Sequence, residues 1–241
     1  MRFYLLLILF LVFGNARAQI DSINSDNKVK TNFNIPGYLK LNFGFTFLDD
    51  ADASMATDFF PSRSLDIYYS KPFFLGENFS FNPGLGISND RLSFSNEIIL
   101  SEIIDSDGVN QIIIDTLSFT PEKNSLKGTY LILPIDLKYY FGSGKYDKRR
   151  FFVGLGGEVG LLLNSSTKVK QKINNTINHT KIKKDFGLND LKYGVTVQLG
   201  IGNFNIYYKK YFSNLFGDNS LPMYITKNPT INKVGISFSV F

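Results

Sequence analysis

Apolar and polar side chains alternate, segment after segment, over most of this chain. In residues 37–47 the odd positions from Leu39 to Phe47 are all apolar, and the even positions between them hold Lys40, Asn42, Gly44 and Thr46. No helix has a two-residue period, whereas a β-strand with one apolar and one polar face does. The pattern therefore predicts strands that separate an apolar from a polar environment.

Eight segments carry this alternation. They are residues 37–47, 64–73, 79–94, 127–141, 151–163, 191–199, 204–212 and 233–241. Pro134 falls on the inner face of the fourth segment and predicts a local bulge there, because proline donates no ladder hydrogen bond. The fifth segment places glycines on its inner face, which keeps a narrow lumen fillable.

The connections between these segments are alternately short and long. Short turns are expected near Gly76, at residues 142–150 and at Gly202, and long connections at residues 48–63, 96–125, 164–186 and 213–232. Bacterial outer-membrane barrels have short periplasmic turns and long extracellular loops. We therefore predict an all-β fold: an eight-stranded antiparallel up-and-down transmembrane β-barrel with both ends of the barrel chain on the periplasmic side.

Aromatic side chains gather at the predicted periplasmic ends, as expected for an interfacial girdle. They are Phe73, Phe74, Phe79, Phe141, Phe151, Phe204 and Phe241. Within the second long connection, the isoleucine-rich residues 98–114 flank Asp107 and Gly108 and predict a hairpin that extends the barrel.

The beginning of the chain predicts export. Arg2 precedes an apolar run at residues 4–13, which is too short to span a membrane, and residues 16–18 form an Ala-x-Ala cleavage site. We expect a signal peptide at residues 1–18, a flexible periplasmic lead at 19–35, and the barrel domain at 36–241. The chain has no cysteine, which excludes disulfides and a lipid anchor on cysteine.

Composition narrows the choice of partners. The net charge is +5, but the basic residues are dispersed and form no nucleic-acid-binding motif, so nucleic acid is not an expected partner. We expect contact with outer-membrane lipid, a monomeric barrel, and recognition by the barrel assembly machinery through the terminal Phe241. Gly235, Ser237 and Ser239 share the register of Phe241, which departs from the usual apolar pattern of that signal.

Four stretches resemble the PorT-like outer-membrane β-barrel family of Bacteroidota. They are FSFNPGLGI at residues 79–87, LPIDLKYYF at 133–141, FFVGLGGEVGLLL at 151–163 and VQLGIGNFNIYY at 197–208. The resemblance covers most of the mature chain and implies an eight-stranded outer-membrane barrel, usually without an assigned activity. Some members take part in type IX secretion and gliding, and no segment here ties this chain to that role.

Catalytic chemistry has little support in the sequence. His179 is the only histidine and lies in a lysine-rich stretch without an adjacent acid and nucleophile. No catalytic residue, cofactor site or metal site is therefore predicted.

Inward-facing ionisable residues form a stronger candidate site. Asp136, Lys138, Glu158 and Lys192 come from three consecutive predicted strands and point into a lumen that eight strands barely leave open. One interpretation is an ion-paired plug, in which Glu158 pairs with Lys192 or Lys138; the other is a small conduction path.

The long connections carry opposite charges. Residues 164–184 contain six lysines and no acid: Lys168, Lys170, Lys172, Lys181, Lys183 and Lys184. The first two long connections are acidic and include Asp49, Asp50, Asp52, Asp58, Glu97, Glu102, Asp105, Asp107, Asp115 and Glu122. Either the lysines contact lipopolysaccharide phosphates, or the loops pair with one another across the mouth.

The sequence thus favours a non-enzymatic outer-membrane barrel with a structural, interaction or assembly role through its extracellular loops. Three alternatives stay open. They are a small pore, a barrel enzyme in which His179 folds back towards Ser or acidic residues, and a soluble lipocalin-like carrier with its apolar faces inside.

Overall fold

The computed structural model describes residues 37–104, 110–143, 150–173, 176–217, 220–223 and 225–240. The predicted signal peptide, the lead and Phe241 lie outside these residues. Within them, no helix is long and apolar enough to cross a membrane.

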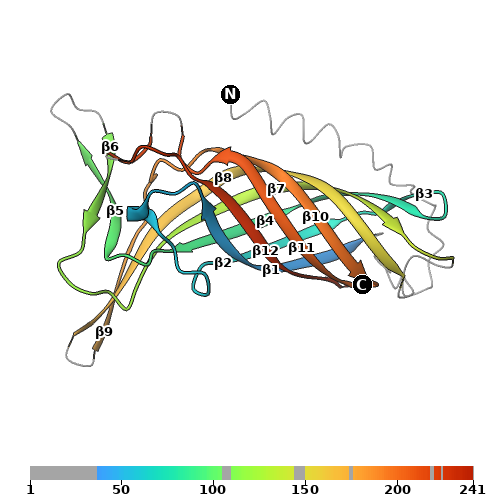
Figure 1. Ribbon diagram of the computed structural model, residues 1–241, viewed down its shortest axis with the longest axis horizontal. Helices are drawn as coiled ribbons and strands as arrows, with labels where there is room; N and C mark the ends of the chain where they lie inside the picture. Colours follow the sequence, from blue (N-terminus) through green and yellow to red (C-terminus); the bar gives the residue numbers. More distant parts are fainter. Residues whose placement is uncertain are drawn as a thin grey trace, which may run out of the picture. The chain divides into compact units, whose positions relative to one another are not determined.

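Eight strands form a closed antiparallel barrel (Figure 1). They are β1 (Tyr38–Asp49), β2 (Arg63–Ser70), β4 (Phe79–Ser93), β7 (Lys123–Tyr140), β8 (Phe151–Ile173), β10 (Leu191–Ile201), β11 (Phe204–Asn214) and β12 (Thr230–Val240). Each strand pairs with the next of these along the chain, and β12 pairs with β1 to close the barrel. The predicted eight-stranded up-and-down fold is confirmed.

The alternation decides which side chains face outward. On β2, Leu65 and Ile67 are 45 % and 43 % exposed on the outer wall, whereas Asp66 between them is 0 % exposed in the lumen. The same division holds around the barrel, so the wall is apolar outside and polar inside. A carrier for apolar ligands needs the reverse, and the lipocalin-like alternative is therefore wrong.

Glycines in left-handed conformation occur in all three short turns. Gly76, Gly142 and Gly202 have φ angles of 73°, 79° and 56°, a region that side chains with a Cβ rarely adopt. Near the first turn, the short strand β3 (Phe73–Leu75) pairs with β4. These turns lie where the sequence predicts them.

Aromatic rings contact one another at the short-turn end of the barrel. Ring centres lie 4.9 Å apart for Phe79 and Tyr139, and 5.3 Å apart for Phe141 and Phe151. A second group at the other end was not predicted from the sequence: Phe59, from the first long connection, stacks on Phe45 at 4.8 Å. Aromatic groups therefore mark both ends of the outer apolar wall.

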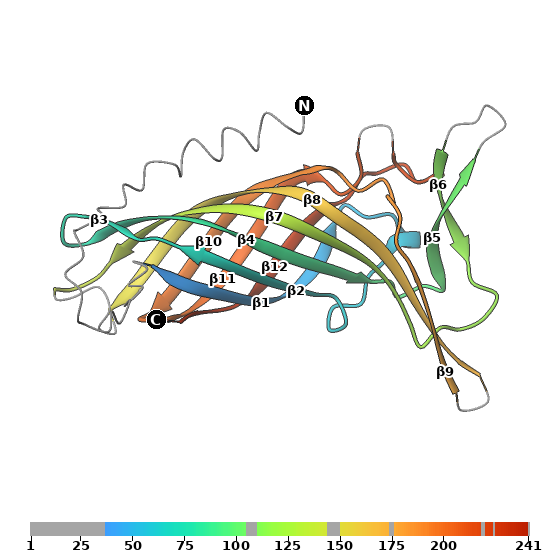
Figure 2. The same cartoon turned by 180° about the vertical axis from the view of Figure 1, so that it is seen from behind.

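The long connections carry structure of their own (Figure 2). The first contains the 3₁₀ turn η1 (Ala53–Met55), and the second contains the predicted hairpin as β5 (Ile98–Ile104) and β6 (Asn110–Thr116). Residues 164–186 are not a loop as expected, because β8 continues to Ile173 and pairs with β9 (Thr176–Ile182). Both hairpins project beyond the long-loop end of the barrel.

The predicted bulge is displaced. The register between β7 and β8 shifts at Thr129 and Tyr130, whereas Pro134 stays paired with Glu158 without interruption. The expectation of a bulge at Pro134 is therefore wrong. The shift leaves Leu163 as the extra residue of β8, so that even-numbered β8 residues beyond it share the outward face of β7.

Candidate functional site

Every strand of the barrel contributes a buried charge to the lumen. On the barrel strands, the buried cations are Lys40, Lys138, Lys192, Lys209 and Lys233, and the buried anions are Asp66, Asp90, Asp136 and Glu158. Charges of this kind are rarely buried unless they are paired, because each loses its hydration shell. The interior is therefore a network of ion pairs in place of an apolar core.

Six of these groups form one continuous chain of alternating sign. Its order is Glu158, Lys209, Asp66, Lys233, Asp90 and Lys192. Successive charged atoms lie 2.5 to 3.3 Å apart. Each of the four inner groups contacts two charges of opposite sign, which offsets the desolvation that burial imposes.

Neutral side chains also contact the charges of this series of ion pairs. The Tyr211 hydroxyl donates to Glu158 at 2.5 Å, and the Ser88 hydroxyl donates to Asp66 at 2.8 Å. Lys192 is the last member of the series of ion pairs, and its ammonium lies 3.9 Å from the centre of the Tyr130 ring, a cation–π distance.

A second group lies towards the short turns. The Lys40 ammonium contacts Asp136 at 3.2 Å and donates to the Gln198 amide oxygen at 3.1 Å. Lys138 differs from the other lumen lysines, because its contacts are the Tyr38 hydroxyl at 3.3 Å and the face of the Phe152 ring at 4.7 Å.

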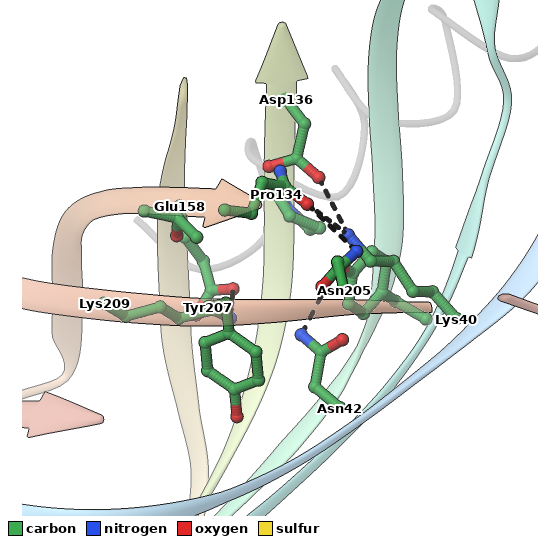
Figure 3. Close-up of a pocket in the computed structure, with 11 residues that line it drawn as sticks. Lys40, Asn42, Pro134, Asp136, Glu158, Asn205, Tyr207 and Lys209 are labelled. Carbon is green, nitrogen blue, oxygen red and sulfur yellow. Dashed lines mark hydrogen bonds and ion pairs between the residues drawn. The ribbon is translucent and has the colours of Figure 1, made fainter. Parts of the chain in front are cut away.

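The cavity between these two groups is very small. Its lining includes Lys40, Asn42, Asp136, Glu158 and Tyr207, and Figure 3 shows Lys40 and Asp136 directed towards each other beside it. The space open to solvent is about 10 Å³. This is about the volume that one water molecule needs.

Glycines on β8 make room for the charges. A Cβ added to Gly156 would meet the Asp136 carboxylate, and it would come within 2.8 Å of the Ile135 carbonyl oxygen. The inward glycines that the sequence places on this strand therefore allow the carboxylate to lie against the backbone.

The four predicted lumen residues all lie inside the barrel, but their pairing differs from the prediction. Glu158 contacts Lys209, and Lys192 contacts Asp90. The expected pairing of Glu158 with Lys192 or Lys138 is wrong. Glu158 and Lys192 come from neighbouring strands, yet their side chains reach partners across the lumen and lie at opposite ends of the alternating chain.

Five lumen charges were missed: Lys40, Asp66, Asp90, Lys209 and Lys233. The sequence carried the signal for them, since each occupies an inward position of an alternating strand. Lys40 and Asp66, for instance, lie between apolar residues that face the outer wall. Applying the inward parity to every strand, including the strand ends, would have found them.

An apolar cluster closes the long-loop mouth above the charges. It joins η1, β5, β6 and the last two long connections to the ends of the barrel strands, and its fully buried members include Met55, Leu100 and Phe216. Backbone hydrogen bonds fasten it, such as that from Met223 N–H to the Ile112 carbonyl at 2.9 Å. The mouth is thus sealed by a packed core contributed by the connections.

Contacts between the long connections at this end include Asp52, one of the acidic residues that the sequence assigns to them. Asp52 in the first connection accepts from the backbone N–H groups of Thr226 and Lys227 in the fourth at 3.0 and 3.2 Å. Donation from Lys227, with that from Thr226, holds the pKa of the Asp52 carboxyl below its usual value. This carboxylate ties the two connections together.

The lysine-rich hairpin is partly paired with acids. Lys170 contacts Glu122 at 2.6 Å, and Lys184 contacts Glu102 at 3.0 Å. The hydrogen bond from Lys170 lowers the pKa of the Glu122 carboxyl. Pairing between loops therefore accounts for two of the six lysines, while Asp105 and Asp107 lie outside the described residues.

His179 lies on β9, exposed and opposite Lys170. The described residues contain no group of three or more His, Cys, Asp or Glu side chains that could hold a metal ion. Within the described ranges, no hydrogen bond joins the histidine to a serine or an acid, as a nucleophilic site requires.

Comparison with known proteins identifies the family. Residues 18–220 match the sequence family described as outer membrane protein beta-barrel domain. The chain belongs to this family. Its members are outer-membrane proteins, and the apolar outer wall of the barrel agrees with that location. No curated protein matches the chain.

Solved structures with related folds are distant. Ail, the attachment invasion locus protein of Yersinia pestis, is 12 % identical with a TM-score of 0.34, over 85 % of this chain and 97 % of that one. A second structure of Ail, in complex with the heparin analogue sucrose octasulfate, has a TM-score of 0.33 at the same identity and coverage. A mutant porin of Rhodopseudomonas blastica is 12 % identical with a TM-score of 0.20, over 85 % of this chain and 98 % of that one.

Proposed function

We propose that this protein is a closed, non-enzymatic barrel of the outer membrane that acts through the structured connections at its long-loop end. The observation that carries the proposal is the double closure of the lumen. The ion-pair network leaves space for about one water molecule, and the apolar cluster covers the mouth above it. A barrel closed in both ways is suited to present a surface, and poorly suited to conduct solutes.

The projecting hairpins supply that surface. β9 ends the described order of paired strands, so the edge that faces away from β8 has backbone groups available to an added strand. All of its described side chains are exposed. In the orientation usual for bacterial barrels, this end faces the outside of the cell.

Within the family, we place the chain in the PorT-like group of Bacteroidota. The support is the proline-containing fourth strand that runs into Lys138, Tyr139 and Tyr140, followed by the glycine-rich fifth strand. A role in type IX secretion would rest on this resemblance alone. We also propose that the barrel inserts as a monomer, with the barrel assembly machinery as partner during biogenesis. The closed sheet supports the monomer, because it leaves the barrel strands no free edge for pairing with a second copy.

Planar-bilayer recording tests the proposal. Refolded protein that runs with heat-modifiable mobility should give no steady open conductance, since the network and the apolar cluster both block the path. The mobility assay ensures that a silent bilayer reflects a folded barrel. A large, steady conductance from the wild-type protein would contradict the closed-barrel proposal and support the pore.

A further inference from the structure

A row of basic side chains crosses the outer wall of the barrel immediately above its apolar band. Arg63 on β2 is directly opposite Arg91 on β4, and Arg91 is directly opposite Lys127 on β7. Directly opposite residues on paired strands have Cβ atoms about 4.5–5.5 Å apart, and like charges at that distance are destabilising. Three cations in neighbouring positions therefore repel one another.

The row continues onto the projecting hairpin. The register shift at Thr129 and Tyr130 turns the even-numbered residues of β8 to the outward face of β7, so that Lys168 lies diagonally beside Lys127. Lys168 is in turn directly opposite Lys181 on β9. We call the five residues Arg63, Arg91, Lys127, Lys168 and Lys181 the cationic row.

Within the part of the chain that the structure describes, the charges of Arg91 and Lys127 have no ion-pair partner. Among the described residues, neither Arg91 nor Lys127 forms a side-chain hydrogen bond or ion pair, and the Arg91 Nε is buried without an acceptor. Arg63 Nε donates to the Phe60 carbonyl at 3.0 Å, which holds its guanidinium at the wall. A buried N–H without an acceptor costs stability unless a ligand or water supplies one.

The position of the row identifies the chemistry of its ligand. Leu65 follows Arg63 by one outward step on β2, which is about 7 Å along a strand, and it is 45 % exposed on the apolar wall. On β4 and β7 the polar pair Asn89 and Thr129, joined at 2.9 Å, separates the row from the apolar band. A molecule with acyl chains on the band would place its head group against the row.

We propose that the cationic row binds the phosphate groups of an anionic lipid in the surrounding leaflet, while the acyl chains of the lipid pack on the apolar wall below. Phosphate oxygens accept bidentate hydrogen bonds from guanidinium groups, and a lipid-borne phosphate brings negative charge to the depth at which the cations lie. The proposal goes beyond the closed-barrel function and does not depend on whether the lumen conducts.

Unfolding midpoints in two kinds of vesicle test the proposal. The protein is reconstituted in phosphatidylcholine vesicles with or without diphosphorylated lipid A, and the midpoint is read from heat-modifiable mobility. The row variant is Arg91→Gln with Lys127→Gln. The matched control, Lys172→Gln with Lys183→Gln, removes the same charge from two lysines outside the row, one on β8 and one directly after β9.

Lipid A should raise the wild-type midpoint by about 2–4 °C, because a ligand that binds only the folded state stabilises it. The midpoint of the control variant should rise equally, and the midpoint of the row variant should rise by less than half as much. In phosphatidylcholine alone the row variant should unfold at the wild-type temperature or above it, since repulsion is relieved. A destabilised row variant there would instead indicate a structural role and overturn the proposal.

Three other results would also overturn the proposal. Lipid A could raise the midpoint of the row variant as much as that of the wild type, or the control variant could lose as much of the rise as the row variant does. Inorganic phosphate in place of lipid A could also give the same rise. The last would identify a free anion as the ligand. Should the double variant fail to fold, Arg63→Gln at the exposed start of β2 tests the same row and should reduce the rise. Added salt should reduce the rise in the wild-type protein, because exposed cations are screened within about 10 Å at 0.1 M.

Discussion

Asp66 illustrates how single residues stabilise this interior. Asp66 is 0 % exposed, and its carboxylate forms ion pairs with Lys209 at 2.8 Å and Lys233 at 3.3 Å. It also accepts a hydrogen bond from the Ser88 hydroxyl. Removing one partner of such a pair leaves a buried charge without compensation. This lowers the stability of the protein by far more than the intact pair raises it. The lumen therefore tolerates matched changes better than single ones.

A double-mutant cycle tests the pairing at Glu158. We expect Glu158→Gln and Lys209→Met each to destabilise the barrel and the double variant to recover part of the loss, with a coupling energy of about 0.5–3 kcal/mol. The measurement is the free energy of unfolding from urea titration in vesicles. The same cycle with Lys138→Met in place of Lys209→Met should be nearly additive. Additivity in the Glu158 and Lys209 cycle would contradict the contact.

The sequence predicts the side on which a residue lies better than it predicts its partner. Strand parity places Asp136, Lys138, Glu158 and Lys192 inward, as the structure does. It does not pair Lys209 with Asp66, which is 143 residues away, because the two strands face each other across the lumen. Such contacts depend on barrel closure and on side-chain reach, and neither is encoded in local spacing.

At the scale of strands, the apolar period determines the outer wall. Ile236 on β12 is flanked by Phe43 on β1 and Ile206 on β11, far from the cations of the wall. We expect Ile236→Arg to cost about 2–4 kcal/mol of unfolding free energy, because the guanidinium would face hydrocarbon. Urea titration in vesicles measures this cost, with Ile236→Ala as control. An equal cost for both variants would show that this position does not face lipid.

The extension of β8 shows where pattern reading failed. Residues 164–184 look like a polar loop because lysines dominate, and both faces of the β8–β9 hairpin lack the apolar stripe that marks a half-buried strand. The two-residue period was nevertheless present, since Lys168, Lys170 and Lys172 alternate with Val169 and Gln171. Thr167 and Val169 are buried on one face of this extension, so a strand without an apolar stripe shows its period in the alternation of charge.

The contact between Glu122 and Lys170 makes the middle of this hairpin sensitive to pH. The pKa of Glu122 is lowered from 4.5 in the folded protein, so its contribution is fully present above pH 4.5 and is lost as the pH falls through the lowered value. We expect hydrogen-exchange protection of β9 around His179, which is directly opposite Lys170, to fall on acidification while β10 keeps its protection. Glu122→Gln should abolish this pH dependence, and unchanged dependence in that variant would assign it to another group.

For the whole molecule, the network makes register and closure interdependent. Every barrel strand contributes at least one buried charge, so a slip of one residue on any strand would turn a charge towards lipid and an apolar side chain into the lumen. The apolar cluster adds a second requirement, because it needs the long connections to meet at one end. A single arrangement of the strands satisfies both.

Orientation in the membrane is the last prediction, and it applies to the molecule as a whole. Lys183 is exposed at the long-loop end, whereas Lys71 is exposed near the short turns. Lys145 and Lys148, which the sequence assigns to a periplasmic turn, lie outside the described residues. If the long connections face the outside, a membrane-impermeant amine label on intact cells should modify Lys183 and spare Lys71. Breaking the outer membrane should then expose Lys71, which controls for its reactivity. Labelling of Lys71 but not Lys183 on intact cells would mean that the barrel is inserted the other way, with its sealed mouth towards the periplasm.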